Sequence, residues 1–131
     1  MITYLVDTNL ILRFLLNDNL KQAQTTRLLI SNAQEGKCIY YLSILLFVEA
    51  VFVLMRLYGF SKKETSDALL AIVDFPSIVI EKKNIVRTAL EWLPLTSVSF
   101  IDLLLAAEAK ETVKTLVTFD KKLKHFASAR V

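Results

Sequence analysis

Acidic residues occupy four positions where a carboxylate is unexpected: Asp7, Glu49, Asp102 and Asp120. Asp7 and Asp120 each follow directly on a strand-like apolar run, at residues 2–6 and 115–119. Glu49 is the only charge in residues 38–55, and Asp102 is the only charge in residues 92–107. An ionised carboxylate in apolar surroundings is costly unless it is paired, protonated or bound to a cation. We therefore predict that these four carboxylates are the ligands of a metal ion and carry the catalysis.

The types of side chain that are present indicate which metal it would be. Oxygen ligands, without cysteine and with His125 as the only histidine, favour Mg²⁺ or Mn²⁺ over Zn²⁺. His125 lies in a basic segment and is interpreted as a surface residue. Polar side chains next to the acids are expected to hydrogen-bond metal-bound water or to hold the carboxylates in place: Thr8, Asn9, Ser99 and Thr118.

Each carboxylate also has a purely structural interpretation. Asp7 and Asp120 could cap the helices that are expected to begin near residues 9 and 121, and Ser99 with Asp102 could form a capping box. Glu49 lies in the middle of a helix that has almost no polar face, where it could be neutral or paired with Arg13 or Arg56. The four acids taken together favour cation binding over these alternatives.

Composition bounds the class of protein. The chain has 131 residues, which corresponds to one domain over residues 1–131. A hydrophobic content of 54% with two glycines and two prolines excludes disorder and low complexity. The single Cys38, interpreted as a small buried hydrophobe, rules out a disulfide within one chain and suits a reducing cytoplasm. The high apolar fraction predicts a homodimer or a tight partner, with the helices between residues 20 and 73 supplying the apolar faces.

A membrane location is not expected. Residues 39–55 are nearly long enough to span a bilayer, but Glu49 lies in their second half. Ser43 divides this stretch into a short strand and a helix that it caps. No Lys or Arg precedes the first apolar residues, so we expect no signal peptide.

Apolar periodicity and capping residues predict alternating strands and helices. Strands are expected at residues 2–6, 38–41, 77–80 and 115–119, and helices at residues 9–16, 20–34, 44–58, 61–74, 84–92, 100–111 and 121–126. Short apolar strands that alternate with helices indicate an α/β fold with a parallel sheet covered on both faces. Ligands bind at the carboxyl ends of such strands, where Asp7 and Asp120 are expected.

Four ordered segments resemble a known family. Residues 6–16 (Val-Asp-Thr-Asn-Leu-Ile-Leu-Arg-Phe-Leu-Leu) closely resemble the opening of PIN-domain ribonucleases of the VapC toxin type. Residues 48–50, 100–107 and 117–123 are similar to the segments that carry the second, third and fourth acidic residues of that family. The resemblance spans about residues 2 to 124 in the family's order and approximate spacing.

The resemblance implies a fold and an activity. The fold would be a three-layer α/β/α domain with a central parallel sheet of four to five strands. The activity would be Mg²⁺- or Mn²⁺-dependent hydrolysis of RNA phosphodiester bonds, by a toxin that forms homodimers and is blocked by a cognate antitoxin protein. Lys121, Lys122 and Lys124 would contact the RNA backbone. Members usually close with a fifth short strand, whereas residues 126–131 here predict that this strand is missing or reduced.

Two other functions share part of this pattern. A haloacid dehalogenase-type phosphatase also places an Asp after its first strand, but it needs a second Asp at position 9, where this chain has Asn9. A non-catalytic PIN-like module that binds RNA or protein would keep the fold and lose the site. The presence of all four acids disfavours it.

Overall fold

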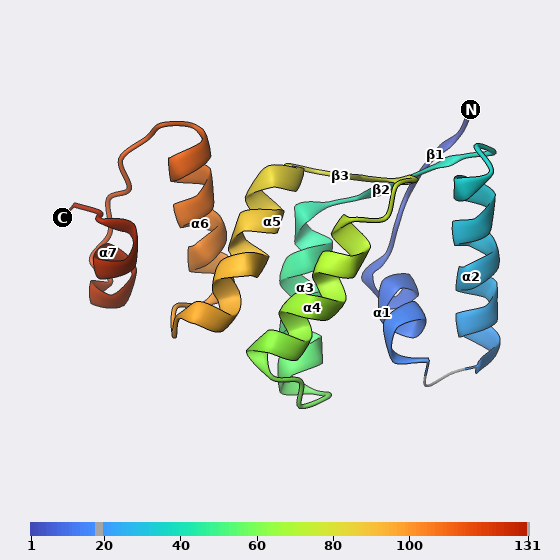
Figure 1. The fold of residues 1–131 in the computed structure, drawn as a ribbon, viewed down its shortest axis with the longest axis horizontal. Helices are drawn as coiled ribbons and strands as arrows, with labels where there is room; N and C mark the ends of the chain where they lie inside the picture. Colours follow the sequence, from blue (N-terminus) through green and yellow to red (C-terminus); the bar gives the residue numbers. More distant parts are fainter. Residues whose placement is uncertain (18–19, 131) are drawn as a thin grey trace.

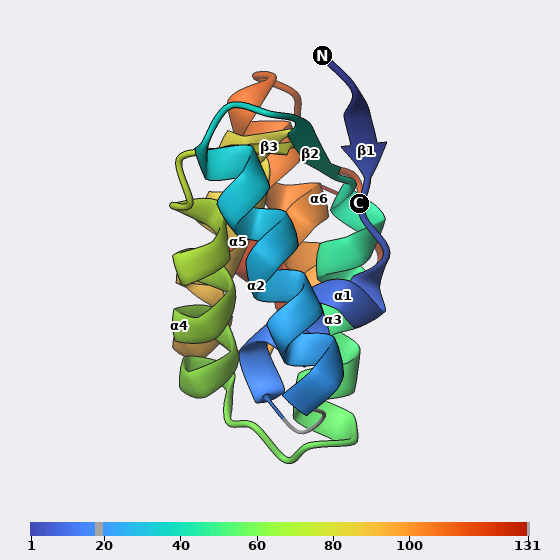
Figure 2. The same cartoon turned by 90° about the vertical axis from the view of Figure 1, so that its right-hand side faces the viewer.

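A parallel sheet forms the centre of the computed structural model, which describes residues 1–17 and 20–130, with the backbone alone at residue 23. In the described chain the sheet has three strands, β1 (Thr3–Leu5), β2 (Ile39–Leu42) and β3 (Ile78–Ile80), in the order β1-β2-β3. Tyr4 lies opposite Tyr40, and Tyr40 lies opposite Ile78. Figure 2 shows the three strands side by side with β1 outermost.

Helices follow each strand and extend the molecule along one axis (Figure 1). Their bounds are α1 (Thr8–Leu16), α2 (Leu20–Gln34), α3 (Ile44–Arg56), α4 (Lys62–Val73), α5 (Lys83–Trp92), α6 (Phe100–Glu111) and α7 (Lys121–Ala127). A short 3₁₀ helix, η1 (Leu93–Leu95), joins α5 to the segment before α6. The helices α1 and α2 pack together, as do α5 and α6.

The core lies between one face of the sheet and helix α3. Tyr40, Leu42, Ile78 and Ile80 alternate along β2 and β3 and are buried, as the two-residue period of a strand requires. They belong to the same apolar cluster as Phe47 on α3, whose side chain is 0% exposed. Burial, together with the nearby Cys38 thiol, raises the pKa of the Tyr40 hydroxyl to about 12.

The second face of the sheet is more open in the described chain. Leu5, Tyr41 and Val79 share this face because they lie in one row of the ladder. Leu5 and Val79 are exposed there, and Tyr41 is half-buried. The described helices therefore cover mainly the face opposite to Leu5 and Val79.

Local signals define the helix boundaries. Ser43 caps α3 by accepting from the Leu45 amide at 3.2 Å. Ser61 and Glu64 form the predicted capping box at the start of α4. At the end of α6, Val113 adopts a left-handed conformation (φ 53°), which is unfavourable for a β-branched residue.

The predicted fold class is confirmed, since the chain is a helix-rich α/β protein with a parallel sheet. The helices predicted at residues 20–34 and 100–111 match α2 and α6. The number of strands differs from the prediction of four to five. Residues 115–119 form no strand in the described chain and make an isolated parallel bridge, Val117 to Arg130. This bridge stands in place of the fifth strand. Val131 lies outside the described residues.

The position of α6 explains why residues 115–119 do not join the sheet. The Lys82 ammonium at the start of α5 donates to Glu108 of α6 at 2.6 Å, which also holds the pKa of the Glu108 carboxyl below its usual range. Because α6 is packed on α5, the segment that follows it emerges at the end of the molecule away from β1 (Figure 1).

Within the described residues no helix has the length and apolar character needed to cross a bilayer.

The structure predicts that truncation of the buried side of α3 destabilises the protein more than truncation of its exposed side. Phe47→Ala should lower the free energy of unfolding by about 3–5 kcal/mol, because it leaves a cavity in the core. Phe52→Ala on the same helix removes a side chain that is 58% exposed and should cost less than about 0.5 kcal/mol. Urea unfolding followed by circular dichroism measures both, and equal losses in the two variants would contradict this assignment of the core.

Candidate functional site

Asp7 and Glu49 are brought into the same region by the residue that follows Asp7. Thr8 is buried at the start of α1, and its Oγ1 donates to Glu49 Oε2 at 3.3 Å. Asp7 itself is exposed and occupies the N-cap position of α1 without a side-chain capping bond. The capping interpretation of Asp7 is therefore not supported by its geometry. Asn9 is exposed on α1 and lines a shallow hollow beside α2.

Glu49 differs from the expectation of a carboxylate enclosed by apolar side chains. Its side chain is exposed on α3, so water solvates the charge without any cation. It forms no ion pair with Arg13 or Arg56 within the part of the chain that the structure describes. The reason for the difference is that α3 is apolar nearly all round, and its outer side stays at the surface with Leu45 and Phe52 exposed.

A cavity of about 690 Å³ connects Glu49 to the start of α6. Ser99, which lines this cavity, is the N-cap of α6 and accepts from the Asp102 amide at 3.3 Å. The capping role foreseen for Ser99 is therefore present. The Asp102 carboxylate, half-buried in the first turn of α6, makes no reciprocal bond among the described residues. The Asp102 side chain therefore does not cap α6.

Asp120 is a helix cap, as one of its two interpretations predicted. Its carboxylate accepts from the Leu123 amide at 2.8 Å at the start of α7. Its own amide donates to Thr118 Oγ1 at 3.0 Å, which fixes the turn before the helix. Lys121, Lys122, Lys124 and His125 are exposed on α7, so the carboxylate lies at the base of a basic helix.

The four acids are not gathered into one metal site in this arrangement. Among the described residues, no group of three or more His, Cys, Asp or Glu side chains lies close enough to hold a metal ion. The donor atoms are carboxylate oxygens, which suit Mg²⁺ or Mn²⁺, but their positions do not fit a shared ion. The largest displacement concerns Asp120, because α7 lies at the opposite end of the long axis from β1 (Figure 1).

One carboxylate near the site was not among the residues predicted from the sequence. Glu81 directly follows β3, and its Oε1 accepts from the Ile44 amide at 2.8 Å and from Ser43 Oγ at 3.4 Å. It therefore caps the helix that carries Glu49. The signal was available, because Glu81 follows a strand-like apolar run in the sequence, as Asp7 and Asp120 do.

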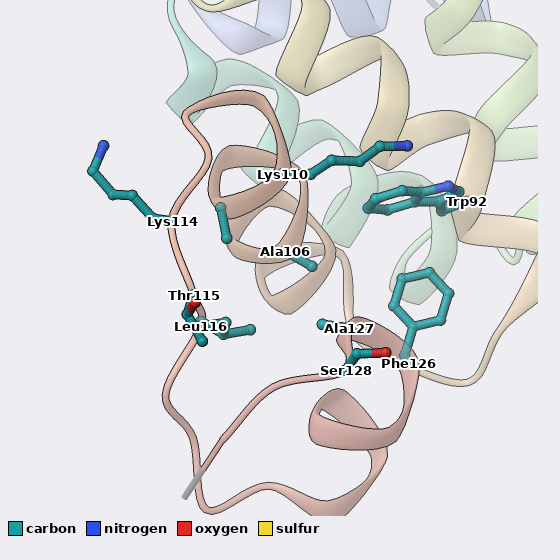
Figure 3. A pocket seen from close by; sticks show the side chains of 10 residues that line it. Trp92, Ala106, Lys110, Lys114, Thr115, Leu116, Phe126, Ala127 and Ser128 are labelled. Atoms are coloured by element: carbon teal, nitrogen blue, oxygen red, sulfur yellow. The ribbon is translucent and has the colours of Figure 1, made fainter.

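A second hollow, of about 530 Å³, lies away from these acids between α5, α6 and α7. Trp92 and Phe126 form its aromatic wall. Their rings pack edge to face, with 5.1 Å between the ring centroids. The Lys110 amino group lies over the Trp92 ring, and Lys114 points away from the hollow (Figure 3). These contacts hold α7 against α5 and α6.

The two N-cap aspartates should respond differently to truncation. Asp120→Ala removes a capping bond and should cost about 1 kcal/mol, whereas Asp120→Asn keeps an acceptor and should cost a few tenths. Asp7→Ala removes no such bond and should stay within about 0.5 kcal/mol of the parent. Urea midpoints of the three variants measure this, and a loss at Asp7 as large as at Asp120 would show that Asp7 has a capping role.

Comparison with known protein families gives a match. The family model described as the PIN domain matches residues 4–129, a stretch that contains all four carboxylates. No curated protein and no solved structure matches the chain.

Proposed function

Because the chain belongs to the PIN-domain family, whose members are generally nucleases, we propose that it is a metal-dependent endoribonuclease that hydrolyses RNA phosphodiester bonds. The observation that carries the proposal is the match over residues 4–129, with an acid present in each of the four ordered segments. We treat residues 1–131 as one such domain.

In this proposal Asp7, Glu49, Asp102 and Asp120 bind Mg²⁺ or Mn²⁺ and form the catalytic centre. Thr8 supports the assignment of Glu49, because its hydroxyl already orients that carboxylate. Ser99 and Thr118 orient the turns before Asp102 and Asp120 by accepting from their amides. Asn9 is exposed two residues after Asp7, so it lies at the same end of β1 as Asp7.

The basic helix α7 provides the contact with the substrate. Lys121, Lys122 and Lys124 are exposed and follow directly on Asp120. Ammonium groups bind phosphate oxygens without reading the bases. Such contacts would hold an RNA backbone beside Asp120 and make binding weaken as salt rises.

We propose further that the protein is the toxin of a toxin–antitoxin pair, acts in the cytoplasm and forms a homodimer. Apolar side chains beside Glu49 support a protein partner, since Leu45, Phe52 and Ile101 are exposed around the 690 Å³ cavity. A cognate antitoxin that covers this cavity would block access to Glu49. The free, buried Cys38 suits a reducing compartment.

One observation favours a second candidate, a PIN-like module that binds RNA without cutting it. The described residues do not gather three acids around one point. The two candidates differ in a single measurable property, which is cleavage of RNA in the presence of a divalent cation.

The wild-type protein should cut RNA when Mg²⁺ or Mn²⁺ is present, and EDTA should abolish the reaction. Asp7→Asn and Asp102→Asn should each lower the rate at least about 100-fold, because a cation loses a charged ligand. Gel analysis of labelled RNA measures the cleavage, and circular dichroism verifies the fold.

Glu111→Gln is the matched control, because Glu111 is an exposed acid at the end of α6 and should keep the wild-type rate. Cleavage at the wild-type rate by a folded Asp7→Asn protein would overturn the proposed centre. Tight RNA binding without cleavage would establish the binding module instead.

Metal binding should also be visible as a change in stability. A cation that binds only the folded protein raises its melting temperature by mass action, so millimolar Mn²⁺ should shift the melting curve upwards. Glu49→Gln should respond less, since it lacks one charged ligand. A melting curve that does not change across a Mn²⁺ titration would argue against a shared carboxylate site.

A further inference from the structure

The α7 hollow, the cavity of about 530 Å³ between α5, α6 and α7, has walls that suit a flat apolar group. The half-buried rings of Trp92 and Phe126 lie on one side of it and the half-buried Leu116 lies on the other (Figure 3). Ala106 and Ala109 line it from α6, and their methyl groups leave the space between these walls open. The volume lies within the range of small-molecule pockets, roughly 300–1,000 Å³. An aromatic ring can therefore enter beside Phe126.

Ammonium groups lie at the rim of the α7 hollow. Lys110 and Lys114 both contribute to its lining, and both are exposed. The Lys110 ammonium lies over the Trp92 ring, 5.6 Å from the ring centroid, whereas Lys114 points away from the hollow (Figure 3). An apolar cavity with cations at its rim is complementary to a ligand that carries an apolar ring beside a negative charge.

The basic surface of α7 continues into this hollow. Ser128 lines the α7 hollow and also a smaller hollow of about 410 Å³, which Lys121, Lys124 and His125 line as well. Residues 110–131 contain six Lys or Arg residues against two acidic residues. A polyanion bound along α7 would therefore meet the α7 hollow without leaving the positively charged surface.

We propose that the α7 hollow binds an unstacked base of single-stranded RNA, while Lys114 and the lysines of α7 hold the phosphates on either side of that base. A single strand offers a flat ring and a negative charge at every nucleotide, and proteins that bind single strands combine aromatic side chains with a basic groove. The bases of a duplex are stacked and paired, so they are not free to enter. This inference rests on the proposed function for the identity of the ligand as RNA.

The polar side chains of the hollow indicate little selectivity for one base. Besides the lysines, Thr115 and Ser128 are the polar side chains that line it, and both are exposed. A hydroxyl can donate or accept a hydrogen bond, so it can pair with the edge of any base. The hollow therefore selects a single strand over a duplex and does not select a particular sequence.

Fluorescence of Trp92 tests this assignment, because Trp92 is the only tryptophan of the chain and lines the hollow. The wild-type protein is titrated with a short single-stranded oligoribonucleotide and with the same sequence as a duplex, in EDTA so that no metal-dependent cleavage occurs. The single strand should quench the Trp92 emission, and the duplex should not. Fluorescence anisotropy of labelled RNA gives the Kd of each independently of Trp92.

Two variants separate the hollow from the basic surface. Ala109→Leu fills the hollow and should weaken binding of the single strand at least about 5-fold, the low end for loss of one stacked base. Ala71→Leu on the exposed side of α4 is its matched control and should bind as the wild type does. Lys114→Gln should reduce the slope of log Kd against log salt by about 0.7, the value for one phosphate contact on a single strand. Lys63→Gln on α4 should leave that slope unchanged.

Quenching by the single strand alone, with loss of affinity in Ala109→Leu and not in Ala71→Leu, supports the proposal. Absence of RNA binding, binding without any change at Trp92, or equal quenching by the duplex overturns it. A peptide of alternating Glu and Phe that quenches Trp92 at lower concentration than the RNA overturns RNA as the occupant.

Cleavage assays distinguish this inference from the proposed function. Quenching by the single strand without cleavage when Mg²⁺ or Mn²⁺ is added overturns the proposed function and leaves the hollow as an RNA site. RNA cleavage by folded Ala109→Leu with the wild-type KM overturns the role of the hollow and leaves the proposed function in place.

Discussion

The carboxyl ends of the three strands meet in one hydrogen-bonded junction, and the placement of the helices depends on it. The Val6 amide donates to Tyr41, the Glu81 amide donates to Leu42, and the Ile44 amide donates to the Glu81 carboxylate. The chain therefore leaves β1, β2 and β3 within one small polar region. Since α1 and α3 begin there, Thr8 can reach Glu49 from a different helix. A carboxylate such as Glu81 at the N-terminus of α3 also offsets the unpaired amides and the positive end of the helix dipole.

Much of this architecture could be predicted because its signals are local. Ser43 and Ser61 act as caps, and glycines follow α2 and α3 at Gly36 and Gly59, both with positive φ. A cap or a left-handed stop depends on a few neighbouring residues, so it can be read without knowledge of the tertiary structure. The predicted end of α2, which Gly36 follows, and the predicted start of α6, which Ser99 caps, agree with the structure for this reason.

The features that could not be predicted depend on distant contacts. Residues 115–119 have the composition of a buried strand, but whether they enter the sheet depends on where α6 packs, which the Lys82–Glu108 contact and the α5 surface decide. The exposure of Glu49 could not be read from α3, because a helix that is apolar nearly all round has no preferred outer side in the sequence. The role of Asp120 as a cap was foreseen, since Asp at that position can bond the amide three residues on.

The valine at the end of α6 has an evolutionary consequence. Amides of Val113 and Lys114 close this helix by donating to Lys110 and Ala109, a termination in which glycine normally takes the left-handed position. A β-branched residue held at φ 53° costs roughly 1 kcal/mol or more. Both glycines of the chain are used after other helices, so this strain persists although a single substitution could relieve it. The protein therefore retains a reserve of unexploited stability, as expected when selection acts only near a threshold. A lineage that needed to tolerate a destabilising change at its acids could draw on that reserve first.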